Sequence, residues 1–112
     1  MKRFLISFDD GAMTFPEQDL PAVGAAARRV VDEAKRAGVW IFGAGVQSQR
    51  ARIVGTDGTV ADGPYPETKA VIGGFCIIEV ASNADALHWA ARFAAACRCA
   101  QEVREIMFDP ES

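Results

Sequence analysis

The sequence predicts an α+β fold in which the order strand, helix, strand occurs twice. Three observations support this prediction. Two segments have apolar residues at helical spacing, each of these is preceded and followed by a short apolar segment, and a hairpin signal lies between the two strand–helix–strand units. The chain has 112 residues, and half of them are hydrophobic. That is enough for one core but too little for separate catalytic and substrate modules, so we expect residues 1–112 to form a single domain.

The first half of the chain contains a strand, a helix and the start of a second strand. Lys2 to Phe8 alternates as a strand with one strongly apolar face does. From about Leu20 to Gly38 an amphipathic helix is expected. Its apolar stripe consists of Val23, Ala26, Ala27, Val30, Val31 and Ala34, and its charged side of Arg28, Arg29, Asp32, Glu33, Lys35 and Arg36. Val39 to Phe42 then begins a strand that is apolar on both faces, until Gly43 and Gly45 loosen it.

An inserted β-hairpin is expected in the middle of the chain. Gln47 to Thr56 reads as its first strand, and Thr59 to Ala61 returns from the turn. Asp57-Gly58 between them is the strongest short hairpin signal in the sequence, because both residue types tolerate the left-handed backbone that tight hairpin turns require.

The second half repeats the pattern of the first. Phe75 to Ala81 is a core strand, Ser82 caps a helix with Asp85 at its third position, and Gln101 to Met107 is the last strand. The expected buried stripe of this helix consists of Ala86, Leu87, Ala90, Phe93, Ala94 and Cys97. With the hairpin set aside, this is the split βαβ order of ferredoxin-like folds, in which both helices cover one face of an antiparallel sheet.

The expected strands are apolar on both faces, although the helices cover only one. The opposing sets are Val39 and Ile41 against Trp40 and Phe42, and Phe75 and Ile77 against Ile78 and Val80. The second face therefore needs a cover. We expect a two-fold homodimer in which the sheets of two copies pack together and enclose a barrel-like interior or a cleft.

Charge and hydropathy exclude several function classes. The net charge of −3 comes from 15 acidic and 12 basic residues scattered along the chain, which leaves no basic stripe for nucleic acid. The apolar run Phe4 to Phe8 is too short for a signal peptide, and no stretch approaches the ~20 residues needed to span a bilayer. We expect a cytoplasmic protein that binds neither nucleic acid nor membrane.

The sequence predicts no metal and no cofactor. Cys76, Cys97 and Cys99 are an odd number of cysteines and are expected as free thiols. Cys97 and Cys99, two apart on a predicted helix, point to opposite sides and make a poor chelate. Gly43-Ala44-Gly45 follows a strand but lacks the third glycine of a dinucleotide fingerprint and any crossover helix after it.

The segment from Asp62 to Lys69 is the main candidate for a site. Its two prolines and its glycine stiffen a loop that carries two carboxylates, a phenol and an amine. Rigid loops next to a sheet are where sites tend to lie. We expect a pocket where this loop meets the open sheet face, with Tyr65, Glu67, Lys69 and Arg104 binding a ligand.

Two carboxylates are candidates for a catalytic base. Asp62 lies in the loop, and Glu79 shares a sheet face with Phe75 and Ile77, where a carboxylate must be paired, raised in pKa or located at a dimer rim. Glu79 either forms an ion pair, with an arginine such as Arg104 or one from a partner chain, or transfers protons. His88, the only histidine, lies on the second helix and is expected as a solvated or structural residue.

Several stretches resemble the YCII-related, or DGPF-domain, family. The stretch from Thr59 to Lys69 followed by Ile72-Gly73-Gly74-Phe75 resembles its central motif, with Tyr65 where phenylalanine is usual. Residues 43–47, 86–91 and 102–106 are similar to its glycine segment, its Trp-containing helix and its terminal Glu-Val-Arg strand. The resemblance implies a dimeric ferredoxin-like α+β barrel.

The resemblance implies less about activity. Most members have no assigned activity, although relatives include a dehydrochlorinase of chlorinated hydroquinones, and the fold is shared with muconolactone isomerases and small monooxygenases. Some members are joined to extracytoplasmic-function sigma factors. Typical members carry a His-Asp pair with the histidine on the first helix, where this chain reads Ala25-Ala26-Ala27-Arg28.

Two functions are therefore expected as alternatives. The first is binding of a small aromatic or anionic molecule, with or without cofactor-independent proton transfer or elimination, in which Asp62 or Glu79 is the base and Arg104 or Lys69 holds an anion. The second is a non-enzymatic interaction or regulatory module linked to sigma-factor-dependent transcription.

Overall fold

The computed structural model describes residues 1–47, 51–63 and 71–112. Their elements confirm the predicted α+β class and its order. In chain order they are β1 (Lys2–Asp9), a 3-10 helix η1 (Glu17–Asp19), α1 (Leu20–Arg36), β2 (Trp40–Gly45), β3 (Arg52–Val54), β4 (Val60–Asp62), β5 (Ile72–Val80), α2 (Asn83–Cys97) and β6 (Glu102–Glu105).

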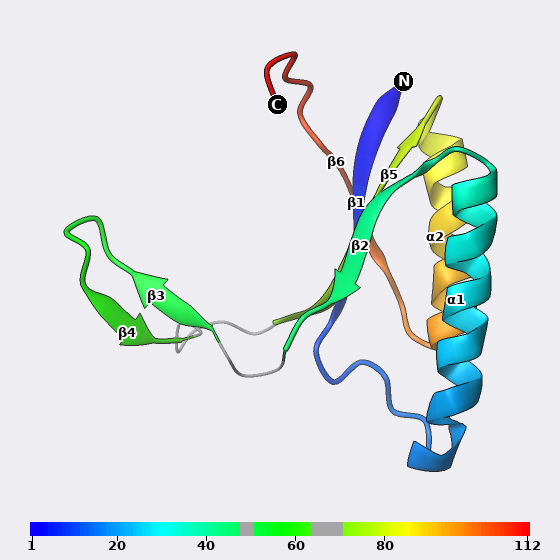
Figure 1. Ribbon diagram of the computed structural model, residues 1–112, viewed down its shortest axis with the longest axis horizontal. Helices are drawn as coiled ribbons and strands as arrows, with labels where there is room; N and C mark the ends of the chain where they lie inside the picture. The colour runs from blue at the N-terminus through cyan, green and yellow to red at the C-terminus, as the bar shows by residue number, and fades with distance from the viewer. Residues whose placement is uncertain (48–50, 64–70) are drawn as a thin grey trace.

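Four of the strands form one antiparallel sheet in the order β2-β5-β1-β6. Each of the two strand–helix–strand units leaves a gap that a strand of the other unit fills, which is the ferredoxin-like topology. Both helices lie on the same face of this sheet (Figure 1). The predicted fold is therefore confirmed.

The core lies between the sheet and the two helices, where alternating residues of the central strands face the apolar helix stripes. Its buried residues are Phe4 and Ile6 of β1, Cys76, Ile78 and Val80 of β5, Val30 of α1, and Ala86, Ala90 and Phe93 of α2. The small alanines of α2 let this helix lie close to the sheet.

The sequence correctly indicated the start of α2 but not its end. The Ser82 hydroxyl accepts a hydrogen bond from the backbone N–H of Asp85 at 3.1 Å, as the predicted cap requires. At its other end α2 stops at Cys97, because Arg98 adopts the left-handed conformation with φ of 57°. Cys99 therefore lies beyond the helix, and the prediction that Cys97 and Cys99 share it is wrong.

Other boundaries also differ from the sequence predictions. β2 runs on through Gly43 to Gly45 in regular pairing with β5, although these glycines were expected to loosen the strand. Leu87 is exposed rather than part of the buried stripe, because successive helix residues are rotated by about 100° and Leu87 therefore points to one side of the stripe that contains Ala86. Among the described residues, the first hairpin strand is limited to β3, and the last strand ends at Glu105.

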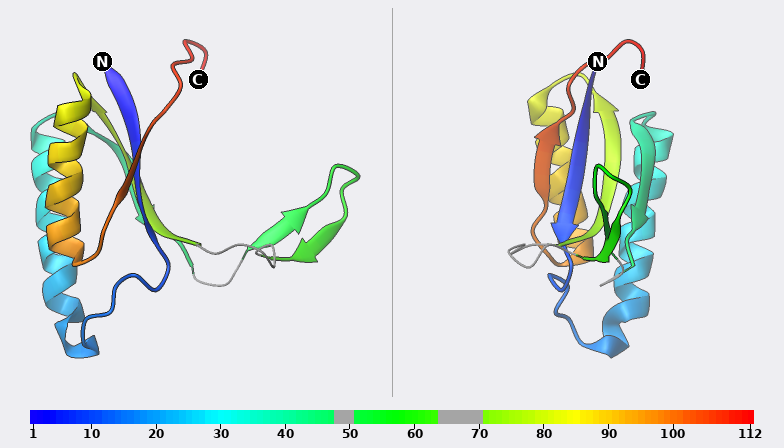
Figure 2. Two further views of the ribbon diagram at one scale, coloured as in Figure 1. Left: turned by 180° about the vertical axis from the view of Figure 1, so that it is seen from behind. Right: turned by 90° about the vertical axis from the view of Figure 1, so that its left-hand side faces the viewer.

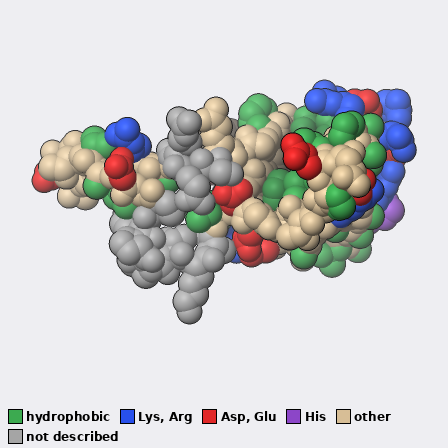
Figure 3. All heavy atoms as spheres, turned by 90° about the horizontal axis from the view of Figure 1, so that it is seen from below, with side chains coloured by type: hydrophobic (Ala, Val, Ile, Leu, Met, Phe, Trp, Pro, Cys, Tyr) green, Lys and Arg blue, Asp and Glu red, His purple; other side chains and the backbone are tan. Residues whose placement is uncertain are grey.

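The predicted hairpin turn is confirmed between β3 and β4. Gly58 has φ of 86°, the Gly55 N–H donates to the Thr59 carbonyl at 2.8 Å, and the Asp57 carboxylate accepts from the Thr59 N–H and hydroxyl. The hairpin projects from the body of the protein on the side of the sheet away from the helices (Figure 2). Lys and Arg side chains gather at the opposite end, over the helices (Figure 3).

The sheet face away from the helices exposes apolar residues, as the sequence predicted, but the prediction that Trp40 and Phe42 share a face is wrong, because the pairing of β2 with β5 shifts between them. Phe75 and Ile77 alternate with the buried residues of β5 and are half-buried, and Phe42, whose ring centroid is 6.0 Å from that of Phe75, is exposed. Beside them Ile41 and Ile77 border a hollow of about 540 Å³ beneath the C-terminal residues 106–112. No helix among the described residues is long and apolar enough to cross a bilayer.

Candidate functional site

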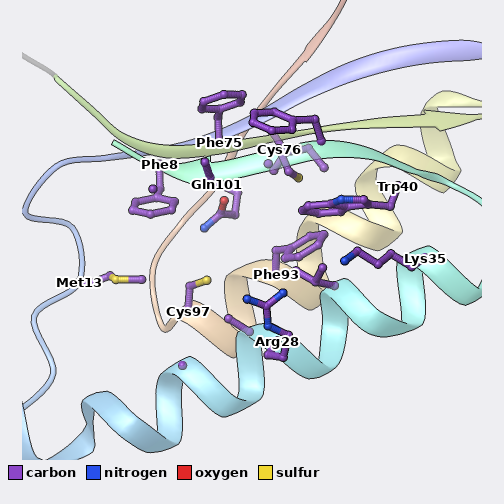
Figure 4. Close-up of a pocket in the computed structure, with 18 residues that line it drawn as sticks. Phe8, Met13, Arg28, Lys35, Trp40, Phe75, Cys76, Phe93, Cys97 and Gln101 are labelled. Carbon is purple, nitrogen blue, oxygen red and sulfur yellow. The ribbon is translucent and has the colours of Figure 1, made fainter. Parts of the chain in front are cut away.

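A cavity of about 520 Å³ lies between α1 and the sheet, on the face that the helices cover (Figure 4). Its walls come from β1, β2 and β5, from both helices, and from the residues before α1 and β6. They are Ile6, Phe8, Met13, Gly24, Ala27, Arg28, Val31, Lys35, Trp40, Phe42, Gly43, Ala44, Gly45, Phe75, Cys76, Phe93, Cys97 and Gln101. A volume of several hundred Å³ suits a small organic molecule.

Helix α1 forms one wall because its apolar stripe is wider than the core needs. Val30 and Ala34 are buried, whereas the neighbouring Val31 and Lys35 line the cavity. Gly24, Ala27, Arg28, Val31 and Lys35 are spaced three and four apart, so they lie along one line of the helix surface. The helix thus turns one edge to the core and the other to the cavity.

Three aromatic rings make the cavity apolar. The rings of Phe8, Trp40 and Phe93 lie on the helix side of the sheet, and the centroids of Trp40 and Phe93 are 6.1 Å apart (Figure 4). Two glycines make room for them. A Cβ at Gly43 would lie 2.6 Å from Cη2 of Trp40, and a Cβ at Gly74 would lie 2.6 Å from Cζ of Phe8. The rings therefore rest against bare backbone.

The charged groups of the cavity are both cations. Arg28 and Lys35 extend from α1 toward the cavity, and both residues are exposed (Figure 4). Neither forms an ion pair with another described residue. No aspartate or glutamate is among the described residues that line the cavity. The arrangement therefore favours an anion over a cation or a neutral ligand.

The remaining polar groups are an amide and two thiols. The Gln101 side chain points into the cavity, and its amide N–H donates to the Cys99 carbonyl at 3.3 Å (Figure 4). Burial, with a smaller effect of the nearby Cys97, raises the pKa of Cys76 to about 12, and burial also raises the pKa of Cys97. Both thiols therefore stay protonated at neutral pH and are poor nucleophiles.

The YCII-related domain model matches residues 3–108, which include both walls of the cavity. The chain belongs to the YCII family. This family match confirms the resemblance found in the sequence. No curated protein matches the chain significantly. In this YCII domain, Arg28 occupies the part of α1 where the resemblance implied a histidine, and it lines the cavity.

The three predicted site residues that the structure describes do not line this cavity. Asp62 ends β4 on the projecting hairpin, where its side chain is 91% exposed and pairs with Arg52 at 3.3 Å. Arg104 lies opposite Leu5 on β6 and pairs with Glu102. Glu79 borders the other hollow, beside the C-terminal residues. The catalytic and binding roles of these residues stay predictions.

Glu79 forms the ion pair that was one of its two expected environments, but with a different arginine. Its carboxylate accepts from Nε of Arg3 at 2.9 Å, rather than from Arg104. Register explains the choice, because Arg3 and Glu79 are directly opposite each other in the β1–β5 pairing, on the sheet face away from the helices.

Tyr65, Glu67 and Lys69 lie outside the described residues, so their expected binding roles stay predictions as well. His88 is exposed, with its ring 5.9 Å from that of Trp89, and it is not among the cavity residues. Within the described residues no group of three or more histidine, cysteine, aspartate or glutamate side chains is arranged to hold a metal ion.

Arg28 and Lys35 were not predicted as site residues. Both were expected on the charged side of the first helix that faces solvent, which is the usual location of such residues. Their spacing of seven residues places them on one line of the helix, but it could not have identified them, because Arg29 and Arg36 have the same spacing and do not line the cavity.

Proposed function

We propose that this YCII domain binds a small organic anion with an aromatic or otherwise apolar body in the cavity between α1 and the sheet. One observation carries the proposal: Arg28 and Lys35 are the charged residues of a cavity that otherwise presents aromatic rings, aliphatic side chains, an amide and protonated thiols. An apolar site with a few converging polar groups is the usual design of small-molecule sites.

The pairing of cation and aromatic ring favours a particular ligand shape. Trp40 and Phe93 offer flat surfaces for a ring, and Arg28 and Lys35 offer donors for a carboxylate or a similar group. Arg28 can hold a carboxylate through two parallel hydrogen bonds, whereas Lys35 acts as a point charge. We therefore propose aromatic carboxylates as the first ligand class to test.

A thermal-shift and calorimetric titration with benzoate and with benzamide, its uncharged analogue of similar shape, tests the proposal. Benzoate-type ligands should raise the melting temperature, and the amide should raise it less. Arg28→Gln and Lys35→Gln should each weaken binding about tenfold, since a hydrogen bond to a charged group contributes about 1.5–3 kcal/mol and is partly screened at the rim.

The helix itself supplies the matched controls. Arg29 and Arg36 each lie one position from a cavity residue and carry the same charge, but neither lines the cavity. Arg29→Gln and Arg36→Gln should leave binding unchanged. Equal weakening by the control variants, or equal binding of benzoate and benzamide, contradicts the proposal, because only nonspecific attraction would then remain.

We also propose that two copies form a homodimer through the sheet face away from the helices. The exposed and half-buried apolar residues of that face, Phe42, Phe75 and Ile77, support this arrangement. Light scattering after gel filtration measures the mass directly. A single-chain mass at the highest soluble concentration contradicts the dimer but not the ligand site, which lies within one chain.

For catalysis, the proposed chemistry is cofactor-independent proton transfer or elimination with Asp62 or Glu79 as the base. Asp62 stands on the exposed hairpin and Glu79 is held by Arg3, so either would have to approach a ligand from outside the cavity. Asp62→Asn and Glu79→Gln separate the two candidates in assays of turnover. Unchanged ligand binding in the Asp62 variant would remove that residue from the binding site.

A further inference from the structure

Among the described residues, the hairpin strands β3 and β4 pair only with each other. They form a separate two-stranded sheet, and neither joins the four-stranded sheet. Figure 1 shows the hairpin extending away from the helices and the main sheet. An isolated two-stranded hairpin is at best marginally stable in water. Additional stabilisation from a contact outside the hairpin is therefore expected, and the described residues of one copy do not show such a contact.

The hairpin nevertheless has a well-specified local structure. Its turn satisfies its own polar groups through the Asp57 carboxylate, which accepts from the Thr59 hydroxyl at 2.7 Å and from its N–H at 3.0 Å. At its base Arg52 pairs with Asp62 across the two strands. Local interactions thus fix the shape of the hairpin and leave its apolar side chains free to contact another surface.

The apolar side chains of the hairpin lie on both of its faces, Ile53 opposite Ala61 on one and Val54 opposite Val60 on the other, and the second pair includes the two large exposed ones. Val54 and Val60 are directly opposite each other, so they point to the same side, and they are 66% and 58% exposed. β-Branched residues are typical of strands that pack on a surface. The valine pair is therefore a contact surface without a partner among the described residues.

The hairpin and the open sheet face lie on the same side of the molecule. Both face away from the helices, and the C-terminal residues extend to this side too (Figure 2). Met107 and Phe108 in that segment are 89% and 88% exposed. One partner seated on this side would cover the open sheet face and meet the hairpin and the C-terminal segment.

The charges of the open face favour a second copy of this chain as that partner. On the described part of this face, Arg3 forms an ion pair with Glu79 and Arg104 with Glu102. A face with a balanced, internally paired set of charges does not repel a copy of itself, whereas a single-sign face does. A two-fold axis would also give each hairpin an equivalent docking position on the other copy.

We propose that the β3–β4 hairpin is a dimerisation arm that docks on a second copy of this chain through Val54 and Val60. The proposal rests on the homodimer of the proposed function and adds the element that stabilises it. In the dimer each arm gains the apolar contact that it lacks alone, and the open sheet face is flanked by an arm from each copy.

Sedimentation analysis of the full chain over a range of concentrations tests the proposal. The Val54→Thr/Val60→Thr double variant keeps β-branched side chains, and so the strands, but makes the contact polar. We expect the dimer dissociation constant to rise about a hundredfold, because two arms each lose the burial of two methyl groups. Val54→Asp/Val60→Asp should give a monomer.

Leu20→Asp/Leu87→Asp is the matched control for the acidic variant. These leucines are 56% and 59% exposed, so the change in charge and exposed apolar area is similar, but they lie on the helices. The control should remain dimeric. Far-ultraviolet circular dichroism and benzoate titration, reported for each variant, show whether the domain itself stays folded.

The outcomes separate this proposal from the proposed function. A dimer whose dissociation constant is unchanged in both valine variants overturns the arm and leaves the sheet-to-sheet dimer standing. A wild-type chain that is monomeric at every concentration overturns both, whereas ligand binding in the cavity stands or falls by its own titration. Assembly into a ring of three copies overturns the two-fold arrangement on which the arm depends, because such a ring has no two-fold interface.

Discussion

The indole ring of Trp40 lies against the backbone of Gly43, so close that a Cβ on the glycine would stand 2.6 Å from Cη2 of the ring. The same Cβ would stand 2.8 Å from Cβ of Cys76 on the neighbouring strand. Trp40 of β2 also packs with Phe93 of α2, so the ring links the sheet to the helices at the cavity. Gly43 is thus required by packing rather than by backbone conformation.

Gly43→Ala should therefore destabilise the protein. The added methyl group must displace the Trp40 ring or the strand, and overpacking of this kind costs about 1–3 kcal/mol. Chemical denaturation followed by tryptophan fluorescence measures the change. Gly45→Ala is the control on the same strand, since a Cβ there meets nothing within 4 Å. Equal effects of the two substitutions would show that strand conformation, not the ring, is what Gly43 serves.

The chain should lose stability in alkaline solution through Cys76. Burial raises the pKa of its thiol from 9.0 to about 12 in the folded protein. Between these values the unfolded chain releases the proton while the folded chain keeps it, so the stabilisation present below pH 9.0 is lost as the pH rises toward about 12. Cys76→Ala should flatten this dependence.

Urea denaturation of both proteins at neutral and alkaline pH provides the measurement for Cys76. The difference between wild type and variant cancels the titration of lysines and of the tyrosine, which both proteins share. Cys99→Ala is the comparison, because Cys99 is less buried than Cys76. Parallel pH profiles of wild type and Cys76→Ala would show that this thiol titrates with an ordinary pKa.

Gly24 offers a way to separate stability from ligand binding. It lies inside α1 and lines the cavity, and a Cβ there meets nothing within 4 Å. Gly24→Ala should raise the free energy of unfolding by about 0.5–1 kcal/mol, because glycine is a poor helix former. Gly24→Leu should keep much of that gain but obstruct the cavity and abolish benzoate binding. Unimpaired binding by the leucine variant would place the ligand elsewhere.

Features that depend on neighbouring residues could be predicted from the sequence. The alternation around Phe4 and Ile6, the cap formed by Ser82 and the turn at Asp57-Gly58 each follow from a few adjacent positions. Together they were enough to give the order of elements and the sheet topology, because few topologies accommodate two strand–helix–strand units.

The site could not be predicted in the same way, because its residues meet only after folding. Arg28 became a cavity residue when β2 packed beside α1, and nothing in its neighbours distinguishes it from Arg29. Glu79 pairs with Arg3 because of the register between two strands more than seventy residues apart in sequence. Sequence patterns indicated which faces are apolar, but not which charges would border a cavity.

The end of α2 was also mispredicted, and Arg98 explains why. Helices commonly end at a glycine in the left-handed conformation, whereas here an arginine adopts it with φ of 57° and ψ of 36°. Its side chain compensates in part, since its guanidinium donates to Asp19 at 2.8 Å and lies 5.8 Å from the ring centre of Phe15. These contacts tie the end of α2 to the segment that precedes α1.

Substitution of Arg98 should separate the backbone strain from the side-chain contacts. Arg98→Ala removes the contacts and keeps the strain, so it should lower the free energy of unfolding by about 0.5–1 kcal/mol, as expected for an exposed ion pair with a ring contact. Arg98→Gly removes the contacts and the strain together. It should exceed the alanine variant in stability by about 1 kcal/mol, because glycine adopts the left-handed conformation without steric cost. Parallel denaturation of the three proteins measures both the stabilisation by the side-chain contacts and the cost of the backbone strain. A glycine variant less stable than the alanine variant would show that the left-handed turn at Arg98 is not formed in solution.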